Sequence, residues 1–203
     1  MNESADIPNL QGRRITLRAL KNEDFIQWKE VRLQNHDWLT KWEPLRAPGQ
    51  TDPAKDLNAF EARCRSRQRE SQLGTGWGFG VFTDGNFIGE INLNNVTRGA
   101  FQSSHVGYWI AQDKAGNSYT PEALVVLMRF AFEELGLHRL QISIVPRNLP
   151  SRRVVEKLNL RCEGLSEKYL EIAGTWEDHL RFAVTSEEWV RRADDLIAEW
   201  IKP

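Results

Sequence analysis

Apolar and polar residues alternate along several short stretches of the chain, and turn residues bound each stretch. Alternation with a period of two, in stretches rich in β-branched and aromatic residues, is typical of strands. It predicts strands at residues 13–20, 76–83, 86–96, 104–112 and 139–145, and a hairpin at 161–185 that turns at Ala173-Gly174. An Asp-Gly pair between the strands at 76–83 and 86–96 predicts a tight turn there.

Other stretches place apolar residues at helical spacing. They predict helices at residues 22–40, 54–72, 121–135, 149–159 and 186–203. For the third of these, Thr120 is the expected N-cap, Pro121 suits the first turn and Gly136 the end. The order of elements predicts an α+β fold with one central sheet, mixed and mostly antiparallel, flanked by helices and followed by an extra C-terminal helix.

Length and composition are those of an ordinary globular protein. The 203 residues are 27% charged and 40% hydrophobic, with a formal net charge of -1, so nothing draws the whole chain to nucleic acid or anionic lipid. The expected organisation is a tail at 1–12, one domain at 13–185, and a C-terminal helix at 186–203 packed on that domain.

The cysteine content and the hydropathy of the chain indicate the cellular compartment in which the protein is expected. Cys64 and Cys162 are the two cysteines and lie far apart, which disfavours a disulfide framework or a zinc site and favours a reducing cytoplasm. The N-terminus lacks the features of a signal peptide, and no apolar run approaches the ~18 residues of a spanning helix. We therefore expect a cytoplasmic protein without a metal and without a membrane partner.

A short run of small and polar residues, Ala115-Gly116-Asn117-Ser118, separates the strand at 104–112 from the helix that follows. The first N–H groups of a helix have no partner within it, and the helix dipole adds positive potential there. A phosphate satisfies both, and small side chains let it approach the backbone. The alternative is a plain strand-to-helix turn.

A second strand end resembles the first. Asn148 follows the strand at 139–145 and can cap the next helix, which leaves Ser151 in its first turn with Arg152 and Arg153 beside it. Two such strands could separate and hold one elongated anionic ligand between them. The alternatives are a simple cap and a solvated helix face.

These segments, in the order "GYWI", "AGNSYTPEAL", "FAFEELGLHRL", "VPRNLPSRRVVEKLNL" and "YLEIAGTWEDH", resemble the GCN5-related N-acetyltransferase (GNAT) superfamily. Within it the chain is most similar to ribosomal-protein-alanine N-acetyltransferases of the RimJ/RimL kind, and closer to the RimJ branch. The resemblance runs from about residue 13 to 189. It implies a GNAT fold and acetyl-CoA, bound in a cleft between the strands at 104–112 and 139–145.

The resemblance also implies roles for particular residues. The pantetheine arm would pair with backbone from Trp109 and Ile110 to Gln112, and Asn148 would hydrogen-bond that arm. Arg152 or Arg153 would reach the nucleotide phosphates, and Ser151 would protonate the departing thiolate. The diphosphate would lie on the N–H groups of Lys114, Ala115, Gly116, Asn117, Ser118, Tyr119 and Thr120.

Two departures from the family pattern matter. Asp113 stands where the pattern has a basic or amide residue, next to the expected phosphate site. Leu170 stands where the RimL branch has its suspected glutamate base. A base therefore does not carry over, and Glu43, Glu90, Asp178 and His179 are the candidates weighed. Glu43 is the one we assign to catalysis.

Trp42, Glu90, Tyr108 and Trp176 are the residues expected to bind the acceptor, although aromatic residues are more often core. The leading hypothesis is acetyl transfer from acetyl-CoA, by direct attack in a ternary complex, to a protein N-terminal amine, with a ribosomal-protein alanine as the expected acceptor. A further possible partner is the ribosome, with which the protein would associate weakly. The alternatives are a GNAT enzyme for a small amine or antibiotic, and a non-catalytic acetyl-CoA binder or ribosome-assembly protein. The oligomeric state, monomer or homodimer, stays open.

Overall fold

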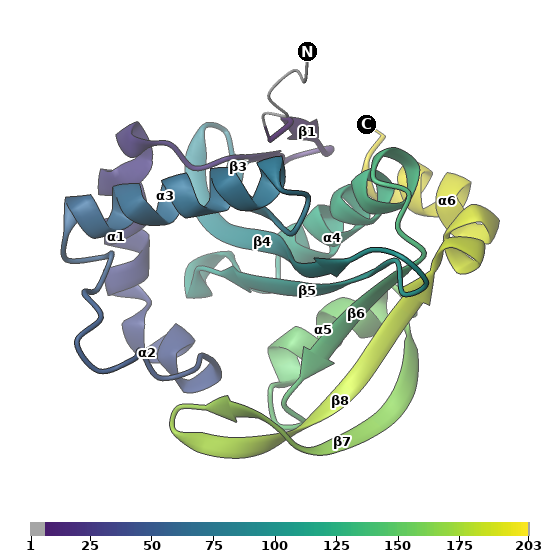
Figure 1. Cartoon of the computed structure of the whole chain (residues 1–203). Helices are drawn as coiled ribbons and strands as arrows, with labels where there is room; N and C mark the ends of the chain where they lie inside the picture. The colour runs from purple at the N-terminus through teal and green to yellow at the C-terminus, as the bar shows by residue number, and fades with distance from the viewer. Residues whose placement is uncertain (1–6, 203) are drawn as a thin grey trace.

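The computed structural model describes residues 7–202, which are built around one eight-stranded sheet (Figure 1). The strand order is β1-β2-β3-β4-β5-β6-β8-β7. The strands are β1 (Leu10–Gln11), β2 (Thr16–Arg18), β3 (Trp77–Thr83), β4 (Asn86–Thr97), β5 (Ser103–Ile110), β6 (Arg139–Ile144), β7 (Arg161–Ile172) and β8 (Thr175–Thr185). Neighbours are antiparallel except for the parallel pair β5–β6, which confirms the mixed, mostly antiparallel sheet.

Helices lie on both faces of the sheet. They are α1 (Phe25–Gln34), α2 (His36–Leu39), α3 (Leu57–Gln72), α4 (Tyr119–Arg129), α5 (Leu149–Lys157) and α6 (Ser186–Trp200). Successive side chains of a strand point to opposite faces. Glu90 of β4 contacts α1 and α3, whereas Ile91, the next residue, belongs to the core cluster on the α4 side. Helices α1 and α3 therefore cover one face, and α4 covers the other.

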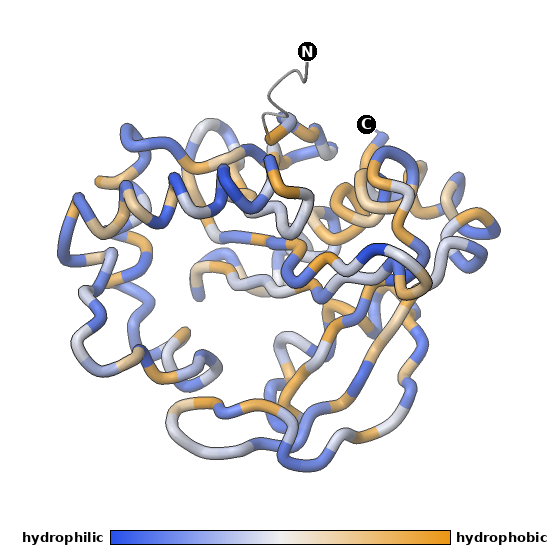
Figure 2. Tube along the Cα trace, in the orientation of Figure 1, coloured by the Kyte–Doolittle hydropathy of each residue, from blue (hydrophilic) through white to orange (hydrophobic). Residues whose placement is uncertain are grey.

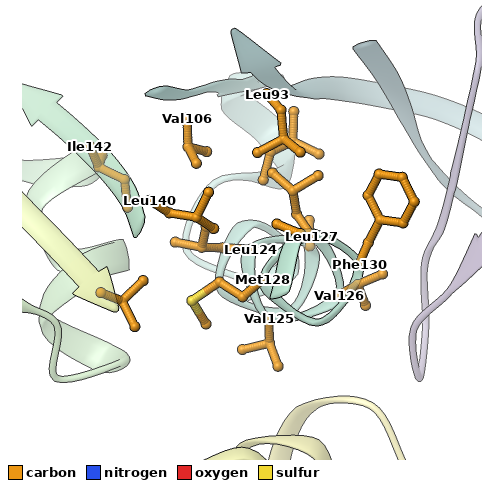
Figure 3. Packing of buried hydrophobic residues seen from close by; sticks show 14 of the residues in the cluster. Leu93, Val106, Leu124, Val125, Val126, Leu127, Met128, Phe130, Leu140 and Ile142 are labelled. Atoms are coloured by element: carbon orange, nitrogen blue, oxygen red, sulfur yellow. The ribbon is translucent and has the colours of Figure 1, made fainter. Parts of the chain in front are cut away.

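The main core forms where α4 packs on the sheet. Leu124, Leu127 and Met128 of α4 are fully buried, and they pack with Leu93 and Val106 of the central strands (Figure 3). Residues 123–128 of α4 are all apolar and buried, and this part of the helix is orange in Figure 2. A helix that is apolar all round needs cover on several sides, and α5 and α6 supply it.

Two predicted helices differ in detail. The single helix expected at 22–40 is divided into a turn at Asn22–Asp24, then α1, α2 and a turn at Thr40–Trp42. The division falls at Asn35, whose side chain bonds to Val31 O on one side and to Gln112 N on the other. The third helix begins at Tyr119, because Ser118 rather than Thr120 is its N-cap and has φ 65°. It continues as one π-helical stretch, Phe130–Glu134.

The ends of the chain add one strand and one helix. Leu10–Gln11, assigned to the tail, forms β1 against β2. Helix α6 packs on α4, and its Trp189 and Leu196 belong to the main core cluster. Residues 1–6 and Pro203, which belong to the predicted tail and helix, lie outside the described part of the chain. Within residues 7–202, no helix has the length and apolar composition that a membrane span requires.

Candidate active site

Strands β5 and β6 separate in the middle of the sheet. They pair only at Ser103–Arg139, Ser104–Leu140 and His105–Gln141. Beyond that point β5 continues to Ile110 while β6 turns away with β8. The two strands expected to hold a ligand between them therefore do leave their backbone groups unpaired with each other.

A cavity of about 1700 Å³ opens at this separation. Its walls come from α1 to α3, from β4 and β5, from the loop before α4, and from α5. The residues predicted for the site that line it are Glu43, Trp42, Glu90, Tyr108, Trp109, Ile110, Lys114, Ala115, Gly116, Ser118, Tyr119, Thr120, Asn148, Ser151 and Arg153. Gln112, Asn117, Arg152 and Trp176 are predicted residues that do not line it.

The loop before α4 presents a row of backbone N–H groups. The N–H of Lys114 donates to Ala111 O, and that of Ala115 donates to Ala111 O and Gln112 O. Within the described residues, the five N–H groups at 116–120 have no hydrogen-bond partner. Gly116 and Ser118 take positive φ values, 83° and 65°, which turn the chain into the helix. Of the N–H groups expected at 114–120 to receive the diphosphate, those at 116–120 are therefore unpaired, whereas those of Lys114 and Ala115 already have partners.

Positive charge surrounds this row. Lys157 of α5 donates from Nζ to Ser118 Oγ at 2.7 Å, and Arg14 donates to Asn117 O at 3.1 Å. Arg153 lines the cavity, whereas Arg152 is turned to Pro146 O and Glu156. Together with the dipole of α4 these groups favour an anion.

Asp113, the acidic departure from the family pattern, does not disturb this environment. Its carboxylate is 68% exposed and pairs with Lys114 at 3.0 Å. It lies outside the cavity lining. The charge of Asp113 is therefore largely screened from the row of N–H groups.

The backbone of β5 and its extension is partly occupied by α1 and α2. Trp38 Nε1 donates to Ile110 O at 3.0 Å, and Asn35 Oδ1 accepts from Gln112 N at 2.7 Å. Since Ala111 N donates to Ile88 O in β4, the Ile110 N–H faces the cavity by the alternation of an antiparallel pair. Of the groups expected to pair with pantetheine, the Ile110 N–H faces the cavity and the Trp109 N–H faces β4, while the Gln112 N–H already has a partner.

Ser151 lies where β5 meets α5. Asn148 caps α5 by accepting from Ser151 N, as predicted. Ser151 Oγ donates to the Tyr108 hydroxyl at 3.1 Å, and that hydroxyl donates to Ser151 O at 3.2 Å. Burial raises the pKa of Tyr108 well above its ordinary value and outweighs the hydrogen bond with Ser151. Tyr108 therefore stays protonated. Its hydroxyl contacts Ser151, whereas the sequence predicted that Tyr108 binds the acceptor.

Glu43 is held in an ion pair. Both of its carboxylate oxygens accept from Arg32, at 2.6 and 2.8 Å, and its carbonyl accepts from Ala173 N at the tip of the β7–β8 hairpin. Burial lowers the pKa of Arg32, but the hydrogen bonds and charge of Glu43 outweigh it and leave this pKa raised. Both carboxylate oxygens of Glu43 are therefore directed at Arg32 and not at an acceptor amine. The arrangement favours a structural role for Glu43 over the catalytic role assigned to it.

Glu90 is also fully engaged. It is 2% exposed, accepts from Trp28 Nε1 at 2.6 Å, and forms an ion pair with Arg63. The alternative to a catalytic role for Glu90 was an ion pair on the sheet, and the structure contains that ion pair. The remaining base candidates are parts of the hairpin. Asp178 accepts from Lys168 N, and His179 is buried against Tyr169.

Trp42 and Trp176 differ in their placement. Trp42 lines the cavity, and the Arg147 guanidinium lies 5.1 Å from the centroid of its ring. Trp176 is 56% exposed at the start of β8 and outside the lining, so it does not contribute the wall predicted for it.

Sequence reasoning did not identify Asn35, Arg32 or Arg63 as parts of the site. The first bonds to the extension of β5, and the two arginines neutralise Glu43 and Glu90. A polar residue in the middle of a helical pattern was a signal for Asn35. The arginines had no such signal, because their partners are distant in sequence. In residues 7–202, no three His, Cys, Asp or Glu side chains cluster in a way that could hold a metal ion.

Comparison with known proteins agrees with this geometry. Residues 14–161 match the family described as acetyltransferase (GNAT) domain. The chain is 32% identical over 177 residues to a probable N-acetyltransferase, YjcK, of Bacillus subtilis, covering 86% of this chain and 96% of that protein. It is 29% identical over 178 residues to the [ribosomal protein uS5]-alanine N-acetyltransferase of Escherichia coli, covering 87% and 90%.

Among solved structures, RimJ of Mycobacterium smegmatis in complex with CoA-disulfide superimposes with a TM-score of 0.86. The two chains are 30% identical, and the match covers 98% of this chain and 97% of that one. The resemblance to the GNAT superfamily and to its RimJ/RimL members is therefore confirmed, as is the GNAT fold.

Proposed function

This chain belongs to the GNAT family of N-acetyltransferases and is an acyltransferase, and from this premise we propose that it acetylates the N-terminal α-amine of a protein with acetyl-CoA. The observation that carries the proposal is the separation of β5 from β6 beside the five N–H groups at 116–120, which have no partner within residues 7–202. Such a gap accepts a narrow, extended ligand with an anionic group at one end.

Each part of the coenzyme has a group of matching chemistry. The pantetheine arm would lie along the free edge of β5, where the Ile110 N–H faces the cavity. The diphosphate would lie on the N–H groups at 116–120, with Lys157 and Arg153 supplying charge. Coenzyme-bound relatives support the assignment, since M. smegmatis RimJ was solved in complex with CoA-disulfide.

The ordinary pKa values of amines favour an α-amine over a lysine side chain as the acceptor. An α-amine has a pKa of ~7.7–8.0 and is partly neutral near pH 7, whereas lysine at ~10.4 is almost wholly protonated. Because Glu43 and Glu90 are both ion-paired, an acceptor that needs little help in losing its proton suits this site. Water at the cavity would carry that proton to solvent.

The transfer then needs a polarised carbonyl and a stabilised thiolate. The neutral amine attacks the thioester carbon, and the Ile110 N–H would stabilise the oxyanion that forms. The C–S bond breaks as the intermediate collapses and the amine loses its proton to water. Ser151 Oγ–H would protonate the thiolate, and water would return a proton to Ser151 Oγ. Tyr108, whose hydroxyl contacts Ser151 Oγ, orients this group.

A ribosomal protein that starts with alanine is the proposed acceptor, because the E. coli relative is named for that reaction on protein uS5. Such an acceptor would place the enzyme in the cytoplasm and in weak, electrostatic contact with ribosomal particles. Co-sedimentation with ribosomes at low salt tests that contact. Recovery of the protein only in the supernatant contradicts it.

The test of the acceptor class is an acetylation assay on matched peptides. One peptide starts with a free alanine and contains a lysine, and its partner has the α-amine blocked. The proposal expects one acetyl group, located by fragmentation at the N-terminus of the free peptide, and none on the blocked one. Acetylation of the lysine, or of small amines or antibiotics only, contradicts it, and release of no thiol with any acceptor favours a non-catalytic binder.

A further inference from the structure

A buried carboxylate, Glu122, lies in the first turn of α4. It is 1% exposed and follows Ser118, the N-cap of the helix, by four residues. A negative charge at this end of a helix interacts favourably with the helix dipole, but it also repels any other anion bound there. The charge of Glu122 therefore needs a cationic partner if the loop before α4 is to hold a diphosphate.

The turn before β2 supplies that partner. Glu122 Oε1 accepts from the backbone N–H groups of Arg14 at 2.6 Å and Ile15 at 3.2 Å, and Oε2 accepts from Arg14 Nε at 2.9 Å. A Cβ at Gly12 would lie 2.8 Å from Oε1, so a larger residue there would displace the carboxylate. Glu122 is thus enclosed by residues 12–15 and neutralised by the Arg14 side chain.

Arg14 also reaches beyond Glu122 to the loop before α4. Its Nη1 donates to Asn117 O at 3.1 Å, and its guanidinium carbon lies 4.8 Å from the centroid of the Tyr119 ring. Arg14 therefore contacts the residues on both sides of Ser118. Ser118 has φ 65°, a left-handed conformation that costs a non-glycine residue free energy and persists where the surrounding structure holds it.

The bond to Asn117 O also determines the direction of the next N–H group. In a trans peptide, the C=O of one residue and the N–H of the following residue point in opposite directions. Because Asn117 O points to Arg14, the Ser118 N–H points away from Arg14, and it has no partner among residues 7–202. Ser118 lines the cavity, whereas Arg14 and Asn117 do not.

We propose that Arg14 is a positioning residue for coenzyme binding, which holds the loop so that the Ser118 N–H is directed at the diphosphate. This inference rests on the proposed function and adds to it a residue that does not touch the coenzyme. Arg14 binds Glu122 through Nε and Nη2 and binds Asn117 O through Nη1. Lysine would carry the same charge on a single nitrogen, without the planar fork that spans both partners.

Arg14→Lys tests the contact without a change of charge. The dissociation constant for coenzyme A, measured by calorimetry, should rise about tenfold, as expected when a hydrogen bond to a charged group is lost. In steady-state kinetics the KM of acetyl-CoA should rise by a similar factor, with kcat and the KM of the acceptor peptide unchanged. A change in all three quantities would mean that Arg14 supports the fold in general and would contradict the proposal.

An acetyl donor without the diphosphate sharpens this test. S-acetylpantetheine carries the thioester and the pantetheine arm but no phosphate. Its kcat/KM should be equal with the unaltered protein and with Arg14→Lys, whereas that of acetyl-CoA should fall about tenfold. An equal fall for both donors would overturn the inference. Where the truncated donor reacts too slowly to measure, the separate effects on the KM of acetyl-CoA and on kcat decide the matter.

Arg13→Lys is the matched control. Arg13 belongs to the same turn, but it donates to Ala198 O and Lys202 O at the C-terminal end of the chain. This variant should bind coenzyme A as the unaltered protein does, and a tenfold loss here as well would contradict a specific role of Arg14.

A second variant keeps the test decisive if Arg14→Lys fails to fold. Arg14→Met combined with Glu122→Gln leaves no unpaired buried charge and keeps a side-chain oxygen for the two backbone N–H groups. The net charge is unchanged, so this double variant should show the same tenfold rise in the dissociation constant for coenzyme A.

Failure of the inference and failure of the proposed function give different results. If coenzyme A binds equally well to the unaltered protein and to these variants, Arg14 does not position the loop and the proposed function stands. If coenzyme A does not bind to the unaltered protein, the proposed function and the inference are both overturned.

Discussion

At the scale of single residues, the proposed chemistry depends on Ser151. Its hydroxyl is fixed by a 3.1 Å hydrogen bond to Tyr108, and its backbone N–H is fixed by the Asn148 cap. Because burial keeps Tyr108 protonated, the pair holds protons close to the point where the thiolate would form. Neither Glu43 nor Glu90 is free to take this role, because each is held in an ion pair.

Ser151→Ala should lower kcat by about 10²-fold, the lower end of what a positioned general acid contributes. The dissociation constant for acetyl-CoA should not change, since the 116–120 amides remain in place. Steady-state kinetics and calorimetry on the same preparation measure the two quantities. An unchanged kcat would remove Ser151 from the mechanism.

The two cysteines offer a separate check at this scale. Burial raises the pKa of the Cys64 thiol to about 11, so about one molecule in a thousand carries the thiolate at pH 8. Cys162 is exposed. Iodoacetamide at pH 8 should therefore alkylate Cys162 long before Cys64, as peptide mass mapping would report. Equal rates would mean that Cys64, a residue of α3, is not packed against the buried cluster that includes Trp28 and Phe60.

At the scale of elements, hydrophobic periodicity predicted nearly all helices and strands because most of them have a buried face; β7, which is exposed along most of its length, is an exception. It failed where a long-range contact decides the local structure. Asn35 divides α1 from α2 by bonding to Gln112, a residue 77 positions away. Ser118 replaces Thr120 as the cap because it takes a left-handed conformation, and β1 is two residues long, too short for any alternation to show.

The site was predictable to a similar degree. The loop before α4 and the cap of α5 were recognisable from short motifs. The partners of Glu43 and Glu90 were not, because ion pairs between distant segments leave no periodic signal in the sequence.

Helix α5 allows a matched comparison of adjacent arginines. Arg153 lines the cavity, whereas Arg152 is bonded to Pro146 O and Glu156. Arg153→Glu should weaken coenzyme A binding about tenfold, the size expected for losing a contact with a charged group. The loss should diminish at high salt.

Arg152→Glu is the control for that change, since it alters the charge of the same helix equally. It should affect the dissociation constant much less. Calorimetric titration of both variants decides the point. Equal changes in the dissociation constant would indicate that the overall positive charge of α5 attracts coenzyme A, and not a contact made by Arg153.

At the scale of the whole molecule, the separated sheet places a titratable group at its branch point. His105 forms part of the last β5–β6 pair. Burial lowers its pKa below the ordinary 6.5, and the charge of Arg181 lowers it further. The folded state therefore prefers neutral histidine.

A lowered histidine pKa makes stability depend on pH in a defined direction. The contribution is complete above pH 6.5, the unfolded value, and is lost as pH falls towards the folded pKa. The Tm should fall between pH 7 and pH 5.5, and it should fall less in His105→Gln. Thermal unfolding across this range measures both proteins. An identical decline in the two would assign the effect to other groups.

The central claim is that coenzyme A occupies the gap between β5 and β6 with its diphosphate on the loop before α4. Amide hydrogen exchange, measured with and without saturating coenzyme A, tests it most directly. Slower exchange should appear at Tyr108 and Ile110, whose N–H groups face the gap because those of Gly107 and Trp109 face β4, and at 116–120, whose N–H groups have no partner among the described residues. Protection of neither segment while coenzyme A is bound would contradict the account.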